Sequence, residues 1–360
     1  MLFISLFFPT YHYFRMNQLA NYPTGMKDLD FEPELTIVLP MRNESSNVVR
    51  KIDEVATMDY PQNKISLMVI DSGSTDNTAQ IAYNHLSSFT SFKECRVITL
   101  EIPGKSVAVN HALKNIDTDF FIMMDSDSSC APDSIRKLTR WFSDNDSVGA
   151  VCGQLAASIN SKEFPYRSRF NTIRVGESII DSTPIFEGSL CAFRLQALGT
   201  GGINQSVNAD DSQMAMLSRS HGYRSIMDPE ILFKEPQVKN TRFRMIRRAQ
   251  GLIRALLLNR RLCFGYGSFS KIMINAIYFY TIFPFLFFSS IFLISKEIFY
   301  NFQSDSMLTL SNVLLISIIC PIFLTRTGRN LILGSSVLIE AQFKILLGKT
   351  YEIWEPIREN

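Results

Sequence analysis

The 360-residue chain lacks several short motifs that mark common binding sites. It contains no G-x-G-x-x-G and no G-x-x-x-x-G-K-[ST] segment, which disfavours a dinucleotide-binding Rossmann site and a P-loop. The Gly104-Lys105 pair lacks the preceding glycine and the phosphate cradle that a P-loop needs. The six cysteines include no C-x-x-C pair and lie scattered, which indicates reduced, buried thiols rather than a zinc site or a disulfide set.

The chain also lacks a strong overall charge. Its formal net charge is +2, so global electrostatics indicates no partner and gives no sign of nucleic-acid binding. The apolar run Leu2–Phe8 is too short to span a bilayer, and no basic region or small-residue cleavage site accompanies it. We interpret residues 1–34 as a membrane-proximal stub, either an interfacial anchor or part of a longer transmembrane helix.

Residues 35–236 alternate between strand-like and helix-like segments. The runs with the length of buried strands are 35–40, 66–71, 96–102, 120–125 and 148–153. This rhythm predicts an α/β domain with a mostly parallel sheet and helices on both faces. Ligands of such sheets bind at the carboxyl ends of the strands, so the polar residues at those ends are the candidates for a site.

The C-terminal part, residues 272–360, contains two long apolar segments. Residues 272–294 carry no charge and are long enough to cross a bilayer with some tilt, and 307–325 form a second candidate. A buried helix of a soluble protein is the alternative for each. Two spans would make this a multi-pass protein of the cell membrane.

A third segment, 331–348, carries Glu340 and Lys344. Because charges are costly in the middle of a membrane, we predict an interfacial amphipathic helix here rather than a span. Arg326 and Arg329 precede it without a neighbouring acid, and the positive-inside rule places that loop in the cytoplasm. The large domain would then be cytoplasmic as well.

Residues 237–271, between the two parts, hold nine Lys or Arg residues and no acid. Apolar residues recur among them at helical spacing: Phe243, Ile246, Leu252, Ile253, Leu256 and Leu257. Such a basic amphipathic helix is typical of segments that bind anionic lipid head groups. A second interpretation adds an arginine that contacts phosphate.

Three of the predicted strands end in polar turns with acidic residues. The turns are Pro40-Met41-Arg42-Asn43-Glu44, Asp71-Ser72-Gly73-Ser74-Thr75-Asp76 and Asp125-Ser126-Asp127. They would converge on one edge of a parallel sheet. Asp125 and Asp127, two residues apart, can place both carboxylates around one hard cation, and Mg²⁺ or Mn²⁺ prefers such ligands.

Six ordered blocks in residues 35–251 extend this pattern. They are TIVLPMRNESSNV, VIDSGSTDNTAQIA, PGKSVAVNHAL, FFIMMDSDSSCAPDSI, IFEGSLCAFR and ADDSQMAMLSRSHGYR. In order and spacing the chain resembles the inverting family-2 glycosyltransferases, which have the GT-A fold. The resemblance implies an enzyme that uses Mg²⁺ or Mn²⁺ to move a sugar from a nucleotide-diphosphate donor.

The resemblance assigns donor-binding roles near the first two strands. The turn with Pro40, Arg42 and Glu44 looks like the nucleotide-base site. Asp71 is similar to the residue that accepts a hydrogen bond from the base. The alternative for Asp71 is a turn-forming aspartate before Ser-Gly.

Further residues match the diphosphate and metal site of the family. Lys105, in the G-K-x-x-A-x-N block, resembles part of the nucleotide and diphosphate pocket. Asp125 would face the ribose and the metal, Asp127 would ligate the metal directly, and Arg247 would contact the diphosphate.

The acceptor side follows from the last two blocks. Gly188 and Ser189 resemble the loop beside the acceptor and the donor sugar. Asp211 matches the catalytic base of the family, and Asp210 the acid before it. The alternative for Asp211 is an acid favoured by a helix N-terminus. A base suits a hydroxyl acceptor better than an already ionised phosphate.

One departure from the family bears on the product. Polymer-forming members carry Q-x-x-R-W after the base, and the Trp helps to seat the growing sugar chain. Arg247 matches the Arg of this motif, but Arg244 stands at the Gln position and Arg248 at the Trp position. This difference disfavours a processive polysaccharide synthase and suits a charged lipid acceptor.

We therefore expect transfer to a membrane-associated acceptor: a lipid-linked sugar, a glycolipid or a polyprenyl phosphate. Three alternatives remain open at this point. They are a processive synthase, a catalytically silent scaffold that binds nucleotide sugar, and a nucleotidyltransferase with a similar sheet.

Overall fold

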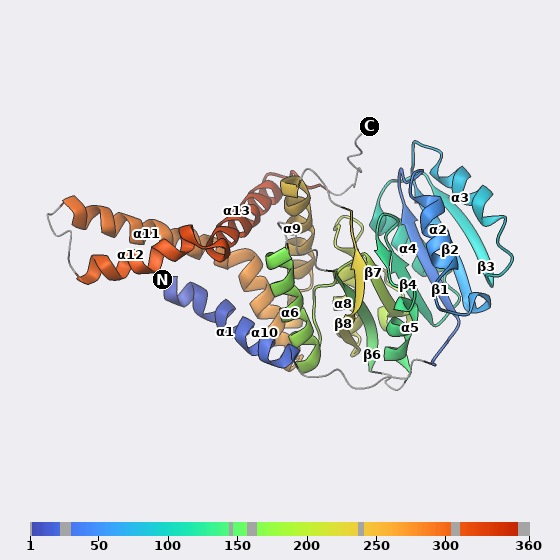
Figure 1. Cartoon of the computed structure of the whole chain (residues 1–360), viewed down its shortest axis with the longest axis horizontal. Coiled ribbons are helices and arrows are strands. Elements are labelled where there is room, and N and C mark those ends of the chain that lie inside the picture. Colours follow the sequence, from blue (N-terminus) through green and yellow to red (C-terminus); the bar gives the residue numbers. More distant parts are fainter. Residues whose placement is uncertain are drawn as a thin grey trace.

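The computed structural model describes residues 2–21, 30–143, 147–156, 164–236, 241–303 and 310–351. In Figure 1 the sheet and its covering helices lie at one end, and helices from both ends of the chain form a long helical part at the other. Helices α6 and α9 lie where the two parts meet.

Eight strands form one sheet in the order β3-β2-β1-β4-β7-β6-β8-β5. Their bounds are β1 Leu35–Met41, β2 Ile65–Ser72, β3 Glu94–Leu100, β4 Phe120–Met124, β5 Ser129–Cys130, β6 Val148–Leu155, β7 Leu190–Arg194 and β8 Arg224–Lys234. Every residue of β1, β2 and β4 is buried, as expected for strands covered on both faces.

The two faces of the sheet pack into two apolar cores. Along β1, Ile37 and Leu39 belong to the core on one face and Val38 to the core on the other. This alternation follows from the two-residue period of side chains along a strand. The helices of this part are α2 Val48–Ala56, α3 Thr78–Leu86, α4 Lys105–Asn115, α5 Ser134–Thr139, α7 Leu195–Leu198 and α8 Asp210–Ser220.

The five predicted strands are confirmed, but the sheet is mixed rather than mostly parallel. β3, β2, β1 and β4 run parallel, whereas β7 is antiparallel to both β4 and β6. β7 returns from the loop after α6 (Phe164–Ile180) and therefore runs against its neighbours. β5, β7 and β8 were not predicted. β5 has only two residues, the apolar run of β7 ends at Phe193, and Asp228-Pro229-Glu230 interrupts β8, so none of them is a long apolar run.

The remaining helices form the helical part. They are α1 Leu2–Ala20, α9 Thr241–Leu258, α10 Ser268–Ile277, the π-helical turn η4 Tyr278–Ile282, α11 Phe283–Gln303, α12 Leu310–Leu324 and α13 Arg326–Leu346. The predicted basic segment 237–271 is not one helix: its described residues form α9, the short turn η3 Arg260–Cys263 and the start of α10. The apolar face of α9 is covered by protein, because Ile246, Ile253 and Leu256 share a core with α10 and α13.

Among the described residues, one continuous helix, Ser268–Asn301, is long and apolar enough to cross a bilayer. Only 28% of its most apolar 18-residue stretch is buried inside the protein, whereas the core helix of a soluble domain is mostly buried. The first predicted span, 272–294, lies inside this helix. Val313–Leu324 and Arg326–Leu346 pass the same test as a pair, with a bend of 77° between them. The second predicted span, 307–325, begins outside the described residues and continues in α12.

The N-terminal helix α1 packs closely on α6. His12 Nε2 lies 2.9 Å from Glu177 Oε1, and the backbone of Met16 lies against Gly176. A Cβ added at Gly176 would come within 2.4 Å of the Met16 carbonyl oxygen. This contact therefore requires a glycine on α6.

Gly176→Ala is accordingly expected to separate α1 from α6 and to destabilise the protein by roughly 1–3 kcal/mol, the usual range for overpacking. Differential scanning fluorimetry in detergent would measure the loss, and limited proteolysis would detect release of α1. Gly201→Ala is the matched control, because a Cβ at Gly201 meets nothing within 4 Å. Equal melting temperatures for the two variants would contradict this account of the contact.

Candidate active site

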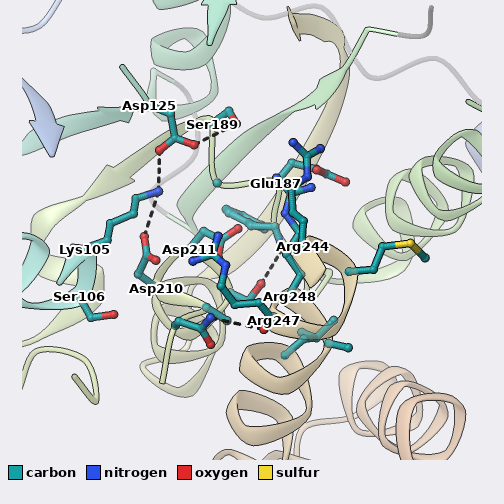
Figure 2. Close-up of a pocket in the computed structure, with 18 of the residues that line it drawn as sticks. Lys105, Ser106, Asp125, Glu187, Ser189, Asp210, Asp211, Arg244, Arg247 and Arg248 are labelled. Carbon is teal, nitrogen blue, oxygen red and sulfur yellow. Dashed lines mark hydrogen bonds and ion pairs between the residues drawn. The ribbon is translucent and has the colours of Figure 1, made fainter. Parts of the chain in front are cut away.

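A cavity of about 870 Å³ lies at the carboxyl ends of β1 and β4. Residues from the sheet edge and α8 line one side of it, and residues from α6, α9, η4 and α13 line the other. Figure 2 shows acidic side chains from the first group facing arginines of α9 across this space. The predicted site residues that line the cavity are Pro40, Arg42, Glu44, Lys105, Asp125, Asp127, Gly188, Ser189, Asp211 and Arg247.

Asp71 is the one predicted site residue that does not line the cavity. Its side chain is buried, with 2% exposure, and its carboxylate accepts hydrogen bonds from the hydroxyl and the backbone N–H of Ser74. Burial raises the pKa of Asp71 despite these bonds. Its neighbour Ser72 does reach the cavity, so Asp71 lies directly behind the cavity wall.

Lys105 is held between acids of two different elements. It opens α4, and its Nζ lies 2.6 Å from Asp125 Oδ1 and 3.5 Å from Asp210 Oδ2. Burial alone would lower the pKa of Lys105, but the charges of these carboxylates outweigh it and the pKa is raised. The lysine is therefore a permanent cation that links β4 to the start of α8, as the dashed lines of Figure 2 show.

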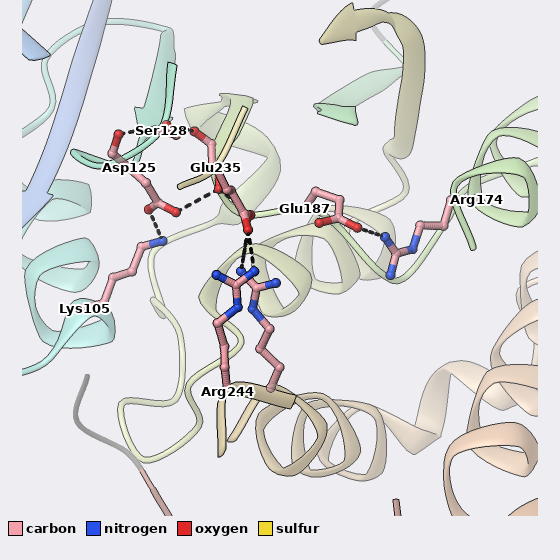
Figure 3. Close-up of polar contacts among 9 residues, drawn as sticks. Lys105, Asp125, Ser128, Arg174, Glu187, Glu235 and Arg244 are labelled. Carbon is pink, nitrogen blue, oxygen red and sulfur yellow. Dashed lines mark hydrogen bonds and ion pairs between the residues drawn. The ribbon is translucent and has the colours of Figure 1, made fainter. Parts of the chain in front are cut away.

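A hydrogen-bonded chain continues from Asp125 across the cavity. The hydroxyl of Ser189 lies 3.1 Å from Asp125 Oδ2 and 3.0 Å from Glu235 Oε1, between the two carboxylates. Glu235 in turn accepts from Arg244 Nη2 at 3.0 Å and from Arg248 Nη2 at 3.2 Å. Figure 3 shows this series running from Lys105 to the α9 arginines.

The Asp125–Asp127 pair is the candidate metal site of the cavity. Among the residues that the structure describes, no group of three or more His, Cys, Asp or Glu side chains is arranged to hold a metal. The pair nevertheless fits a hard cation that keeps water or diphosphate ligands, as Mg²⁺ commonly does. Burial, followed by the charges of Asp125, Glu44 and Glu235, raises the pKa of Asp127 to about 6. A divalent cation would relieve this concentration of negative charge.

Asp211 lies in the first turn of α8, against the loop that contains Gly188. A Cβ at Gly188 would come within 3.1 Å of Asp211 Oδ2, so the absence of a side chain allows the loop to lie this close. Burial and then the charge of Asp210 raise the pKa of Asp211 to about 7. A carboxylate with this pKa can accept a proton near neutral pH.

Arg247 of α9 lines the cavity and is partly buried. Burial and then the neighbouring charge of Arg248 lower the pKa of Arg247 to about 10. It therefore remains protonated at neutral pH and brings a positive charge to the side of the cavity opposite Asp125.

The helical part supplies an apolar wall to the same cavity, from Tyr280, Leu333, Val337 and Leu338. Tyr280 lies in the π-helical turn η4. Gln342 of α13 donates to the carbonyl oxygens of Tyr280 and Thr281 at 3.4 and 3.2 Å. This contact fixes η4 against α13 beside the cavity.

The segment after α13 contacts the loop that precedes Asp210 and Asp211 at the start of α8. Asn208, two residues before Asp210, donates from Nδ2 to the carbonyl oxygen of Tyr351 at 3.1 Å. Gln250 of α9 donates to the carbonyl oxygen of Lys349 and accepts from the backbone N–H of Tyr351. The start of α8 is thus joined to α9 and to the C-terminal segment.

The family model described as Glycosyl transferase family group 2 matches residues 120–326, more than half of the chain. A second model, Glycosyl transferase family 2, matches residues 36–202. The chain is a family-2 glycosyltransferase. The predicted family is thereby confirmed, and with it the assignment as an enzyme.

This glycosyltransferase resembles curated and solved proteins to different extents. The poly-β-1,6-N-acetyl-D-glucosamine synthase of Staphylococcus epidermidis is 27% identical over 171 residues, which are 46% of this chain and 40% of that protein. The synthase of Staphylococcus aureus is 23% identical over 231 residues, 60% of this chain and 54% of that protein. The chain thus spans about half the length of these curated relatives.

A mannosyltransferase from Pyrobaculum calidifontis, solved in complex with GDP-Man and Mn²⁺, matches with a TM-score of 0.81 at 25% identity. The match covers 96% of this chain and 97% of that one. The likeness therefore includes the helical part as well as the GT-A sheet.

Sequence reasoning missed several cavity residues of the glycosyltransferase. Glu235, at the end of β8, was overlooked because β8 itself was not predicted, although an acid directly before the basic stretch was a visible signal. Arg174 of α6 forms an ion pair with Glu187, the residue before Gly188. Nothing in the local sequence around Arg174 or Tyr280 indicated that either reaches the cavity.

Proposed function

We propose that this glycosyltransferase uses Mg²⁺ or Mn²⁺ to transfer a sugar, with inversion, from a nucleotide-diphosphate donor to a hydroxyl group of a membrane-associated acceptor. The observation that carries the proposal is the single cavity that contains the Asp125–Asp127 pair, Asp211 and the apolar wall of the helical part. A donor site and an apolar wall in one cavity suit an acceptor that comes from a membrane.

The donor would lie along the sheet edge. The turn with Pro40, Arg42 and Glu44 lies next to Ser72, and this side of the cavity suits the nucleotide base, with Asp71 behind it. Lys105 and Arg247 would contact the diphosphate from opposite sides. Asp125 and Asp127 would hold the cation, which supplies charge stabilisation to the departing diphosphate.

Asp211 would act as the general base. It takes the proton of the acceptor hydroxyl while that oxygen forms a bond to the anomeric carbon, and the bond from this carbon to the diphosphate oxygen breaks. The nucleoside diphosphate leaves with the bonding electron pair. Gly188 and Ser189 form the loop beside the reacting sugar, and the closeness of Gly188 to Asp211 directs the base towards it.

We further propose a multi-pass membrane protein with its catalytic domain in the cytoplasm. The support is the apolar helix Ser268–Asn301, together with Arg326 and Arg329, which lie in the first turn of α13 rather than in the predicted loop.

The raised pKa of Asp211 predicts how the rate depends on pH. With a pKa near 7, Asp211 is mostly protonated at pH 6 and cannot accept the hydroxyl proton. Turnover at saturating donor should therefore rise about tenfold from pH 6 to pH 8, with a midpoint near 7. A rate that is constant over this range would show that ionisation of Asp211 does not limit the reaction.

The reaction itself would be tested on the full chain in detergent with Mn²⁺, using UDP- and GDP-sugars and a membrane lipid extract. Release of nucleoside diphosphate that depends on the lipid extract supports the proposal. Release of pyrophosphate would identify a nucleotidyltransferase instead. Failure of every donor with protein of native melting temperature would reject the proposal.

A processive synthase is the second candidate, because the curated relatives are polysaccharide synthases. Product length separates the two functions. Mass spectrometry of the reaction products is expected to show addition of one sugar, whereas a ladder of lengths would favour the synthase.

A further inference from the structure

We infer that the acceptor is an anionic lipid, that Arg244 and Arg248 bind its phosphate, and that its hydrocarbon chain lies along the apolar wall of η4 and α13. This inference rests on the proposed function and specifies its acceptor. The phosphate is a recognition group, and the sugar is transferred to a hydroxyl elsewhere on the head group.

Two arginines of α9 meet at one carboxylate on the wall of the cavity. Arg244 and Arg248 lie four residues apart, on one face of α9, and both donate to the single carboxylate of Glu235. Described α9 contains no acidic residue. The two guanidinium groups therefore place two positive charges side by side at the cavity, which suits an added anion.

The two arginines are also accessible to different degrees. The side chain of Arg248 is 46% exposed, whereas that of Arg244 is 13% exposed, and both line the cavity. Arg248 can thus receive a ligand from the cavity directly, and Arg244 adds its positive charge beside it. Guanidinium groups recognise phosphate oxygens through paired, charge-assisted hydrogen bonds.

Position along the cavity separates this pair from the donor site. Lys105 and Asp125 stand at one end of the hydrogen-bonded chain, and Glu235 with Arg244 at the other, as Figure 3 shows. The hydroxyl of Ser189 lies between Asp125 and Glu235, and Arg248 also donates to Glu235. The donor diphosphate is provided for by Lys105 and Arg247. The arginine pair therefore remains for a second anionic group, that of the acceptor.

The apolar wall begins on the same side of the cavity. Leu333 and Val337 lie one turn apart on α13, and Leu333 is 45% exposed although it lines the cavity. The ring of Tyr280, on the π-helical turn, forms the adjoining surface. Because η4 is continuous with the apolar helix Ser268–Asn301, a chain along this wall would lead towards the lipid phase.

Three probes test the contacts of the lipid phosphate and of the hydrocarbon chain on the full protein in dodecyl maltoside. The probes are farnesyl phosphate, farnesol and inorganic phosphate, and microscale thermophoresis measures their binding. Farnesyl phosphate should bind at least about tenfold more tightly than either fragment, because each fragment lacks one of the two contacts.

Two variants with matched controls locate the contacts. Arg248→Gln should weaken farnesyl phosphate about tenfold, and Arg260→Gln, an equal charge change on the exposed turn after α9, should not. Leu333→Asn should weaken it as well, whereas Leu346→Asn should not, since Leu346 is 81% exposed on the same helix and does not line the cavity.

Three results would overturn the inference: inorganic phosphate binding as tightly as farnesyl phosphate, farnesol doing so, or Arg248→Gln and Arg260→Gln behaving alike. Titration of the same samples with UDP and GDP plus Mn²⁺ separates this inference from the proposed function. Nucleotide binding without farnesyl phosphate binding rejects the anionic lipid alone. Absence of both rejects the donor site too.

Discussion

Asp211→Asn is expected to reduce kcat by about 10²–10⁴-fold, the range associated with loss of a general base. The substitution keeps the shape of the side chain against Gly188 but removes its ability to accept the hydroxyl proton. Because Asp211 is not assigned to the donor, the affinity for nucleoside diphosphate should stay within about twofold of wild type. Steady-state kinetics and calorimetric titration with UDP and GDP would measure the two effects.

The control for this variant is Asp117→Asn, which removes the same charge from a side chain that is 83% exposed before β4. It should leave kcat unchanged. The pH dependence adds a second control, since the rise between pH 6 and pH 8 should disappear from the residual activity of Asp211→Asn. A variant with wild-type kcat would show that another group accepts the proton.

Asp127→Asn is expected to change nucleotide binding and stability in opposite directions. Loss of one carboxylate of the Asp125–Asp127 pair should reduce Mn²⁺-dependent nucleotide affinity by at least about 100-fold. Without metal the same substitution should raise the melting temperature at pH 7.5 by roughly a few degrees. The cost of burying the charge, and the repulsion from Asp125, Glu44 and Glu235, together raise the pKa of Asp127, and both are then removed.

The expected increase in stability of Asp127→Asn follows from the linkage between protonation and folding. The pKa of Asp127 is near 6 in the folded protein and below 4 in an unfolded chain, so ionisation of this residue destabilises the fold as pH rises from 4 to 6. Above pH 6 the full cost is present, and Asn avoids it. Mn²⁺ should raise the melting temperature of the wild type but not of Asp127→Asn.

Asp133→Asn is the matched control, as the side chain of Asp133 is 46% exposed and pairs with Lys137 away from the cavity. Mn²⁺ should still raise the melting temperature of Asp133→Asn, as it does for the wild type. If Asp127→Asn retained Mn²⁺-dependent binding of UDP or GDP, the assignment of Asp127 as a metal ligand would be wrong.

The sheet edge was largely predictable from the sequence because its signals are local. Each of β1, β2 and β4 is an apolar run followed directly by polar residues, so the positions of Glu44 and Asp125 follow from strand ends alone. Parallel pairing then brings them together without further information. Asp71 shows the limit of this reasoning, since a residue at a strand end can also turn behind the cavity wall.

The other side of the cavity depends on contacts between distant segments. Arg174, Tyr280 and Leu333 come from three helices, and their approach to Asp211 is set by packing of α6, η4 and α13. The helical period of α9 predicted its apolar face, but the pattern could not tell whether lipid or α13 covers that face. Likewise, β7 is antiparallel because the loop after α6 enters the sheet from the opposite end. The hydrophobic periodicity of a sequence does not predict the direction in which a strand enters a sheet.

The contacts of Asn208 have a consequence for dividing the chain. A fragment that ended at residue 236 would keep both cores of the sheet, together with Asp125, Asp127 and Asp211. It would lack Tyr351, and also the backbone of α9, whose Gly251 lies against Asn208. Ile185, Val207 and Met216 would lose the core that they share with α9, α10 and α13. Truncation should therefore affect the two activities unequally. The excised sheet domain should still hold a nucleotide through Lys105, although more weakly without Arg247, whereas sugar transfer should be lost because the residues that present Asp211 would have lost their supports.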